Sequence, residues 1–204
     1  MIPAVAFERI IQELERRPLE VNNYRAKAGA GRSQAFGVVK KRCLPPDYSR
    51  QCWRRPYLYK LLLDFGRQYV TDISWNAITI NQNYSAGPHY DKGNEGPSYL
   101  VGFGHYQGGA LRFHESDLSG CHEVRHMPLI TTFHDRLHSV EPWTGNRYSL
   151  VYYKLKDVPP LPPPSIELID CEWRFKRGDE VIDPKKGLPG HPISLFHERK
   201  KTQN

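Results

Sequence analysis

His89 and Asp91 are the first residues whose types and spacing could form a chemical site, and they lie in the segment Gly87-Pro-His-Tyr-Asp-Lys-Gly93. On an extended segment, residues separated by two point to the same side, so an imidazole and a carboxylate can reach one ion. His138 offers a second imidazole downstream. Two imidazoles and one carboxylate leave open positions on a metal, as in non-haem Fe(II) centres.

Arg147 follows His138 at the start of a predicted strand, and Ser149 lies two residues further on, facing the same side. A rigid guanidinium fork beside a hydroxyl suits a bidentate carboxylate. The order of the five residues therefore predicts a metal with an organic anion held next to it.

These residues resemble the pattern of the Fe(II)- and 2-oxoglutarate-dependent dioxygenases, which is His-x-Asp, a distal His and an Arg shortly beyond it. The match covers roughly residues 75 to 154. The resemblance implies that His89, Asp91 and His138 are the catalytic residues and bind Fe(II). It also implies that Arg147, helped by Ser149, binds 2-oxoglutarate, and that O2 is consumed with release of succinate and CO2.

Two assignments within this pattern have competitors. His134, followed by Asp135, could also be the distal ligand, but the family spacing to Arg147 favours His138. In the related AlkB-like enzymes an Asn and a Tyr on the strand before the iron pair reach the co-substrate. The resemblance implies this role for Asn81 or Asn83, with Asn81 preferred, although asparagines at such a position also stabilise turns. Tyr84 is the weaker tyrosine candidate.

The segment from His89 to Gly109 is similar to the ten-eleven-translocation and base-J-binding-protein group, which oxidises the methyl group of 5-methylcytosine or thymine in DNA. The shared residues are the Asn after His-x-Asp, then Gly-Pro-Ser, then Gly-x-Tyr-x-Gly-Gly. The resemblance implies a DNA substrate bound by residues near the site, namely Arg32, Ser33, Tyr90, Asn94 and Ser98. Prolyl or other protein side-chain hydroxylation, AlkB-like nucleic-acid demethylation and a non-catalytic DNA- or protein-binding role are the alternatives.

Composition agrees with a basic, folded chain. The 204 residues are 39% hydrophobic and 25% charged, enough for one substantial core, and the net charge is +7. Basic residues gather between Arg32 and Arg55 and in the tail from Arg199 to Lys201. Clustered cations favour polyanionic partners, so DNA is the expected partner.

The ends and the cysteines indicate the compartment. No signal-peptide core and no run of about 18 to 20 apolar residues is present, so we expect a soluble intracellular protein, nuclear in a eukaryote and otherwise cytoplasmic. The four cysteines form no Cys-x-x-Cys pair, which favours reduced thiols.

The hydrophobic periodicity predicts a mainly β chain with flanking helices (α+β). Helices are expected over 5–14 and 57–69 and a proline-rich basic loop over 42–55. Short strands, expected over 35–39, 75–81, 98–103, 110–113, 129–133 and 148–154, indicate a jelly roll. With the family resemblance, this implies a double-stranded β-helix (cupin-like) core.

The predicted organisation has three parts. Residues 1–157 form the oxygenase domain, with N-terminal helices in 1–70 and the β-helix core in 71–157. The prolines of 158–164 predict an extended connector, and 165–204 is an extension of uncertain order.

Overall fold

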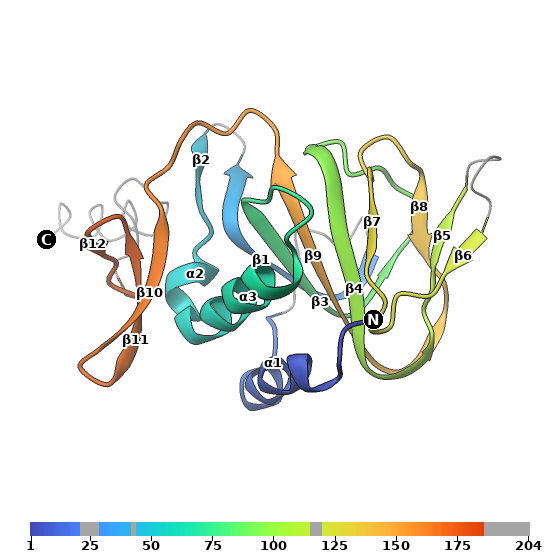
Figure 1. Cartoon of the computed structure of the whole chain (residues 1–204), viewed down its shortest axis with the longest axis horizontal. Helices are drawn as coiled ribbons and strands as arrows, with labels where there is room; N and C mark the ends of the chain where they lie inside the picture. The colour runs from blue at the N-terminus through green and yellow to red at the C-terminus, as the bar shows by residue number, and fades with distance from the viewer. Residues whose placement is uncertain (21–28, 42–43, 115–119, 186–204) are drawn as a thin grey trace, which may run out of the picture.

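A computed structural model describes residues 1–20, 29–41, 44–114 and 120–185. A main sheet of six strands has the order β2-β1-β3-β9-β4-β7, and two three-stranded sheets have the orders β6-β5-β8 and β10-β11-β12 (Figure 1). The main sheet comprises β1 (Gly29–Lys41), β2 (Leu44–Tyr48), β3 (Ala77–Ala86), β4 (Asn94–Gly108), β7 (Leu129–Thr131) and β9 (Trp143–Leu155). One smaller sheet comprises β5 (Leu111–Phe113), β6 (Gly120–His122) and β8 (His138–Val140). The other comprises β10 (Pro164–Ile169), β11 (Glu172–Arg177) and β12 (Glu180–Val181).

Three helices, α1 (Val5–Arg16), α2 (Gln51–Arg54) and α3 (Pro56–Tyr69), accompany the main sheet. Phe7 of α1 stacks on Phe103 of β4 with ring centroids 4.7 Å apart. The hydroxyl of Tyr152 on β9 donates to the Leu62 carbonyl of α3 over 2.6 Å. These buried contacts place the largest hydrophobic core between the helices and one face of the sheet.

The central strand β9 shows how the sheet serves two purposes. Tyr148, Leu150 and Tyr152 belong to the core shared with the helices, whereas Arg147 and Ser149 line a pocket on the other face. This is the period-two alternation of a strand whose two faces are both covered. The pocket therefore lies between the main sheet and the smaller sheet β6-β5-β8.

The predicted mainly β fold with flanking helices is confirmed, and α1 and α3 match the two expected helices. All six expected strands are present, four of them longer than predicted, and the additional strands are β2, β6, β8, β10, β11 and β12. Strand β8 has only three residues, too few to show an alternation of polar and apolar side chains in the sequence.

The predicted loop over 42–55 is wrong in its described part, because residues 44–48 form β2 and residues 51–54 form α2. Pro45 and Pro46 made this segment look irregular, since proline has no N–H to donate to a neighbouring strand. The segment is the edge strand of the main sheet, where only one side needs to pair, so prolines are tolerated. Arg42 and Cys43 lie outside the described residues.

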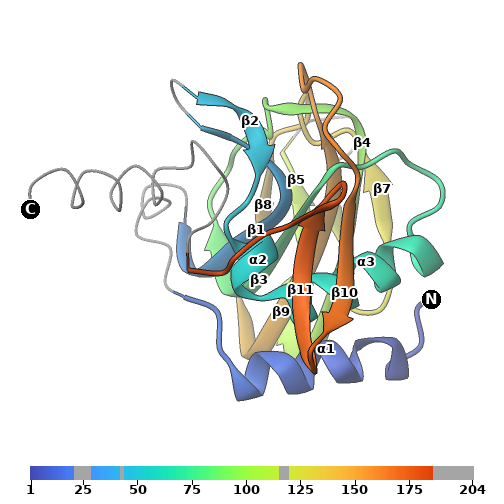
Figure 2. The same cartoon turned by 90° about the vertical axis from the view of Figure 1, so that its left-hand side faces the viewer.

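The part of the chain after the proline-rich segment packs on the core. Phe175 of β11 is 1% exposed, Ile182 is 2% exposed, and the Phe175 ring meets Tyr48 edge-on at 5.4 Å. Figure 2 shows β10 and β11 side by side at this end of the molecule. Strands β1 and β2 likewise show that residues 1–70 supply part of the main sheet as well as helices. The three-part division of the chain stays a prediction, and the tail from Arg199 lies outside the described residues.

No helix in the described part of the chain is long and apolar enough to cross a membrane. Cys52 is buried, Cys121 and Cys171 are exposed, and all three are free thiols.

Candidate metal centre and adjoining pocket

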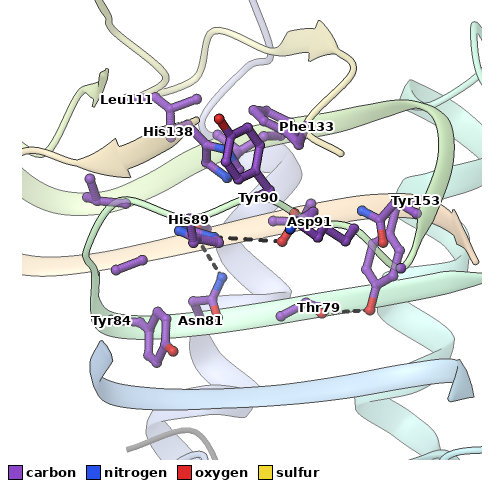
Figure 3. A pocket seen from close by; sticks show the side chains of 18 of the residues that line it. Thr79, Asn81, Tyr84, His89, Tyr90, Asp91, Leu111, Phe133, His138 and Tyr153 are labelled. Carbon is purple, nitrogen blue, oxygen red and sulfur yellow. Dashed lines mark hydrogen bonds and ion pairs between the residues drawn. The ribbon is translucent and has the colours of Figure 1, made fainter. Parts of the chain in front are cut away.

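Backbone pairing brings His89, Asp91 and His138 together. The His89 N–H donates to the His138 carbonyl over 3.0 Å, and the His138 N–H donates back to His89 over 3.1 Å. The Asp91 N–H donates to the Phe133 carbonyl over 2.9 Å. The segment after β3 is thereby bound to the start of β8, and one ligand atom from each of the three side chains lies within 4.8 Å of the others (Figure 3).

Both histidines are oriented by a local hydrogen bond at Nδ1. Nδ1 of His89 lies 2.8 Å from the Gly87 carbonyl, and Nδ1 of His138 lies 2.8 Å from the Arg136 carbonyl. A carbonyl can only accept, so Nδ1 is the donor in each pair, and Nε2 is the nitrogen that faces a metal in the neutral imidazole. Metal-ligating histidines are commonly held in this way. Nε2 of His89 is 3.7 Å from Oδ1 of Asp91.

Burial favours the neutral form of His138. Its side chain is 4% exposed and packs against the Phe133 ring at a centroid distance of 4.7 Å. Burial lowers the pKa of His138 and outweighs the opposing hydrogen bond to the Arg136 carbonyl. Because a metal binds the unprotonated imidazole, a lowered pKa leaves this ligand ready at neutral pH.

Arg147 is a buried cation with no carboxylate partner in the part of the chain that the structure describes. The residue is 2% exposed, and no described carboxylate forms an ion pair with it. Its Nε donates to the Gly109 carbonyl over 3.2 Å, and the guanidinium lies 5.5 Å from the Tyr106 ring and 5.6 Å from the Trp143 ring. Burial lowers the Arg147 pKa, and Nη2 has no hydrogen-bond partner among the described residues. An unpaired buried charge is costly, so this geometry suits an anionic ligand.

Ser149 and Asn81 stand opposite each other on β9 and β3, and Nδ2 of Asn81 donates to Oγ of Ser149 over 3.2 Å. Oδ1 of Asn81 is buried and has no partner in the described structure. Asn83 is directed elsewhere, since its Oδ1 accepts the Arg147 backbone N–H over 2.7 Å. Of the two asparagines, Asn81 lines the pocket and Asn83 does not.

One pocket of about 330 Å³ contains the six principal candidates, His89, Asp91, His138, Arg147, Ser149 and Asn81. Tyr84 also lines it. Leu100, Leu111 and Phe133 give the pocket an apolar wall. The hydroxyls of Thr79 and Tyr153, which are 3.1 Å apart, form another polar group on its lining (Figure 3).

The residues proposed to bind substrate are not all brought to this pocket. Tyr90, 41% exposed, and Asn94 line it, whereas Ser98 is fully buried behind Asn94, whose Nδ2 donates to Oγ of Ser98 over 3.4 Å. Arg32 and Ser33 are not among the lining residues. Arg32 donates to the Leu19 carbonyl over 2.8 Å, and Ser33 is 2% exposed on β1, paired with Asn81.

The basic residues between Arg32 and Arg55 are less available to a ligand than the sequence suggests. Arg55 is 3% exposed, donates to Oε1 of Gln34 over 3.3 Å and lies 3.9 Å from Oε1 of Glu13. Its inclusion among DNA-contacting cations is therefore wrong. Lys40 and Arg50 are surface residues that pair with Asp157 and Glu20.

His134, the competing histidine, is not part of the group formed by His89, Asp91 and His138. Its Nε2 lies 4.0 Å from Oδ2 of Asp135, and it lines a separate hollow. The structure places His138 beside His89 instead.

Sequence reasoning missed three features of the pocket. Thr79 and Tyr153 could have been found by stepping in twos from Asn81 and Arg147 along their strands. Gly109 belongs to the Gly-Gly motif in sequence, and a Cβ there would lie 2.7 Å from Nε of Arg147. No local signal distinguishes that glycine from a turn glycine.

No protein-family model matches the sequence, and no curated protein matches it. Among solved structures, NgTET1 in complex with 5mC DNA is similar at a TM-score of 0.51, with 16% identity over 76% of this chain and 69% of that chain. An oxidoreductase of the 2OG-Fe(II) oxygenase family from Burkholderia pseudomallei is similar at a TM-score of 0.50, with 21% identity over 74% of this chain and 82% of that chain. The chain therefore has the predicted double-stranded β-helix fold, which is the fold of the 2OG-Fe(II) oxygenases, and carries a His-Asp-His group within it.

Proposed function

We propose that the protein is an Fe(II)- and 2-oxoglutarate-dependent dioxygenase that oxidises the methyl group of a modified pyrimidine, 5-methylcytosine or thymine, in DNA. One observation carries the chemistry. The His-Asp-His group and the buried, carboxylate-free guanidinium of Arg147 line the same pocket.

The donor set fits the proposed metal. Two Nε2 atoms and one carboxylate form a facial set that suits Fe(II) and leaves positions for other ligands. The Nδ1 hydrogen bonds of His89 and His138 orient this set before any metal binds. Fe(II) with 2-oxoglutarate and O2 supplies the oxidation of a C–H bond, with release of succinate and CO2.

The chain contributes binding and orientation. Arg147 pairs with the distal carboxylate of 2-oxoglutarate through its guanidinium fork, and Ser149 adds a hydroxyl on the same face of β9. Asn81 holds the Ser149 hydroxyl in place and offers its unpartnered Oδ1 to the pocket. The side chains of Leu100, Leu111 and Phe133 give the pocket an apolar wall beside the reacting groups.

Three observations support DNA as the substrate. The fold is similar to that of NgTET1 in complex with 5mC DNA, the net charge of +7 favours a polyanion, and Tyr90 stands partly exposed at the pocket. An enzyme that oxidises a base must take it out of the stack, and an aromatic ring at the pocket suits an extruded base.

The test is mass spectrometry of nucleosides and peptides after incubation with Fe(II) and 2-oxoglutarate. The substrates are 5-methylcytosine DNA, thymine DNA, N-methylated DNA and a proline-rich peptide. We expect a mass gain of one oxygen on a pyrimidine methyl group, lost in Asp91→Ala and retained in the control His105→Ala, an exposed residue of β4. Oxygen gained only by the peptide, or demethylation alone, would replace the DNA-methyl assignment.

The metal assignment has a readout that does not depend on substrate. Anaerobic calorimetric titration with Fe(II) should show one site in the wild type and none in the double variant His89→Ala/Asp91→Ala. Persistent binding in that variant would refute the ligand set.

A further inference from the structure

A second hollow adjoins the metal pocket. It has a volume of about 470 Å³ and is lined by Lys92, Asn94, Glu95, Gly96, His134 and Lys156. We call it the lysine hollow. Lys92 and Asn94 line both the lysine hollow and the metal pocket, so a ligand that occupies the pocket can extend directly into the hollow.

The fold brings its two free lysines together from distant parts of the sequence. Asn94 and Leu155 are partners in the pairing of β4 with β9, and the Lys156 N–H donates to the Gly93 carbonyl over 3.2 Å. Lys92 lies on the turn closed by the Asn94 N–H and the Asp91 carbonyl, 2.9 Å apart. The lysine pair is therefore held by backbone contacts at the edge of the metal site.

The charges of the hollow do not cancel. The Glu95 carboxylate accepts a hydrogen bond from Nζ of Lys154 over 2.8 Å, so this acid is already paired. Neither Lys92 nor Lys156 forms an ion pair with a carboxylate in the described ranges. Asp135 does not line the hollow, and its Oδ2 lies 4.0 Å from Nε2 of His134. Two unpaired cations in one hollow repel each other and favour an anion between them.

Tyr90 links the hollow to the pocket. Nζ of Lys92 lies 5.7 Å from the centre of the Tyr90 ring, which lines the metal pocket and is 41% exposed. An exposed aromatic ring next to a cation is the combination that binds a base and its backbone in single-stranded nucleic acids. A free carboxylate ligand would make use of the cations but not of the ring.

We propose that the lysine hollow binds a backbone phosphate adjacent to the nucleotide that is oxidised. This inference rests on the proposed function, because it takes the occupant of the metal pocket to be a base. Lysine binds phosphate as a point charge, and holding the backbone beside an extruded base stabilises the distorted strand.

The first test measures binding of the full chain to a single-stranded oligonucleotide with one 5-methylcytosine, by fluorescence anisotropy over a range of KCl concentrations. In Lys92→Gln/Lys156→Gln we expect affinity to fall at least about tenfold, as for loss of charged hydrogen bonds. The slope of log K against log salt should decrease by about one. Lys92→Arg/Lys156→Arg keeps both charges and should restore the slope.

The matched control is Arg9→Gln/Arg67→Gln, which removes two positive charges from α1 and α3. It should leave the slope nearly unchanged, because these charges lie away from the pocket. An equal decrease in both double variants would mean that only net charge matters, and would overturn the site. Circular dichroism melts of each variant report whether it folds.

The second test locates the phosphate. Single neutral methylphosphonate linkages are placed in turn around the 5-methylcytosine. One linkage next to the target should weaken binding to the wild type and have no further effect on Lys92→Gln/Lys156→Gln. Equal sensitivity of both proteins at every linkage would overturn the proposal.

The two levels of inference fail in different ways. If the wild type oxidises 5-methylcytosine DNA but the lysine variants keep the full slope of log K against log salt, the phosphate site in the lysine hollow is wrong and the proposed function stands. If the wild type oxidises only peptides, and the lysine pair alters only their affinity, both are wrong.

Discussion

Gly109 leaves the space that the side chain of Arg147 occupies. A Cβ at Gly109 would lie 2.7 Å from Nε and 2.8 Å from Cδ of Arg147, and the Gly109 carbonyl accepts the hydrogen of that Nε over 3.2 Å. The glycine after β4 therefore positions the cation proposed to bind 2-oxoglutarate, although it lies 38 residues away in sequence.

Gly109→Ala should weaken 2-oxoglutarate binding about ten- to hundredfold, because the guanidinium must shift by a large part of an ångström. The measurement is calorimetric titration of 2-oxoglutarate into the Mn(II)-loaded protein. Gly109 also has a φ of +71°, so backbone strain needs a control. Gly178→Ala is the control, because Gly178 has a φ of +58° and a Cβ there would contact only Cβ of Pro162, at 3.4 Å. It should lose stability without losing 2-oxoglutarate affinity, and an equal loss in both variants would contradict the positioning role.

Arg147→Lys should weaken 2-oxoglutarate far more than iron. Lysine keeps a charge but loses the planar fork, and removing one partner of a buried charge pair costs about 2–5 kcal/mol, or about thirtyfold and upward. Arg125→Lys is the matched control, since Arg125 also lies over the Tyr106 ring, at 5.7 Å, but is exposed. Separate titrations with metal and with 2-oxoglutarate distinguish the two effects. Equal losses of both ligands would place Arg147 in a structural role.

His138→Ala should lower Fe(II) affinity by more than the roughly 10–100-fold that changing an outer-shell partner costs. His134→Ala should keep the wild-type iron affinity, because this side chain lines the lysine hollow and not the metal pocket. Anaerobic calorimetry of the two variants compares them directly. Loss of iron in His134→Ala with retention in His138→Ala would reverse the choice of distal ligand.

Phe7→Ala should lower the free energy of unfolding by about 3–5 kcal/mol, because it leaves a cavity in the core. Phe7 is 1% exposed and packs between Phe103 and Phe65, at centroid distances of 4.7 and 5.2 Å. Val5 on the same helix is 64% exposed, so Val5→Ala should change the free energy of unfolding by less than about 0.5 kcal/mol. Urea unfolding monitored by fluorescence gives both values. A small effect at Phe7 would mean that α1 contributes little to the folded core.

Local sequence patterns predicted most of the helices and strands and two pairs of candidate site residues. The apolar spacing in α1 and α3 and the short apolar runs of the strands depend only on neighbouring residues, so they predicted these elements. The same-side rule for residues two apart placed His89 with Asp91 and Arg147 with Ser149, and the structure finds each pair on one pocket.

Local sequence patterns could not predict the edge strand β2 or the burial of Arg55. Whether a proline breaks a strand depends on whether both sides of that strand are paired, and whether an arginine is solvated depends on what folds over it. Neither is a property of the local sequence. Basic residues between Arg32 and Arg55 therefore looked alike, although Arg55 is 3% exposed and Arg50 is on the surface.

The sequence by itself determined the residue types of the metal site, the faces on which they lie and the mainly β fold, because these follow from periods of two and 3.6 along the chain. Only the tertiary structure decided which histidine lies beside His89, that Gly109 makes room for Arg147, and that Lys92 and Lys156 line one hollow. These relationships join distant segments and depend on strand register, because a shift of one residue would move each side chain of a strand to the opposite face.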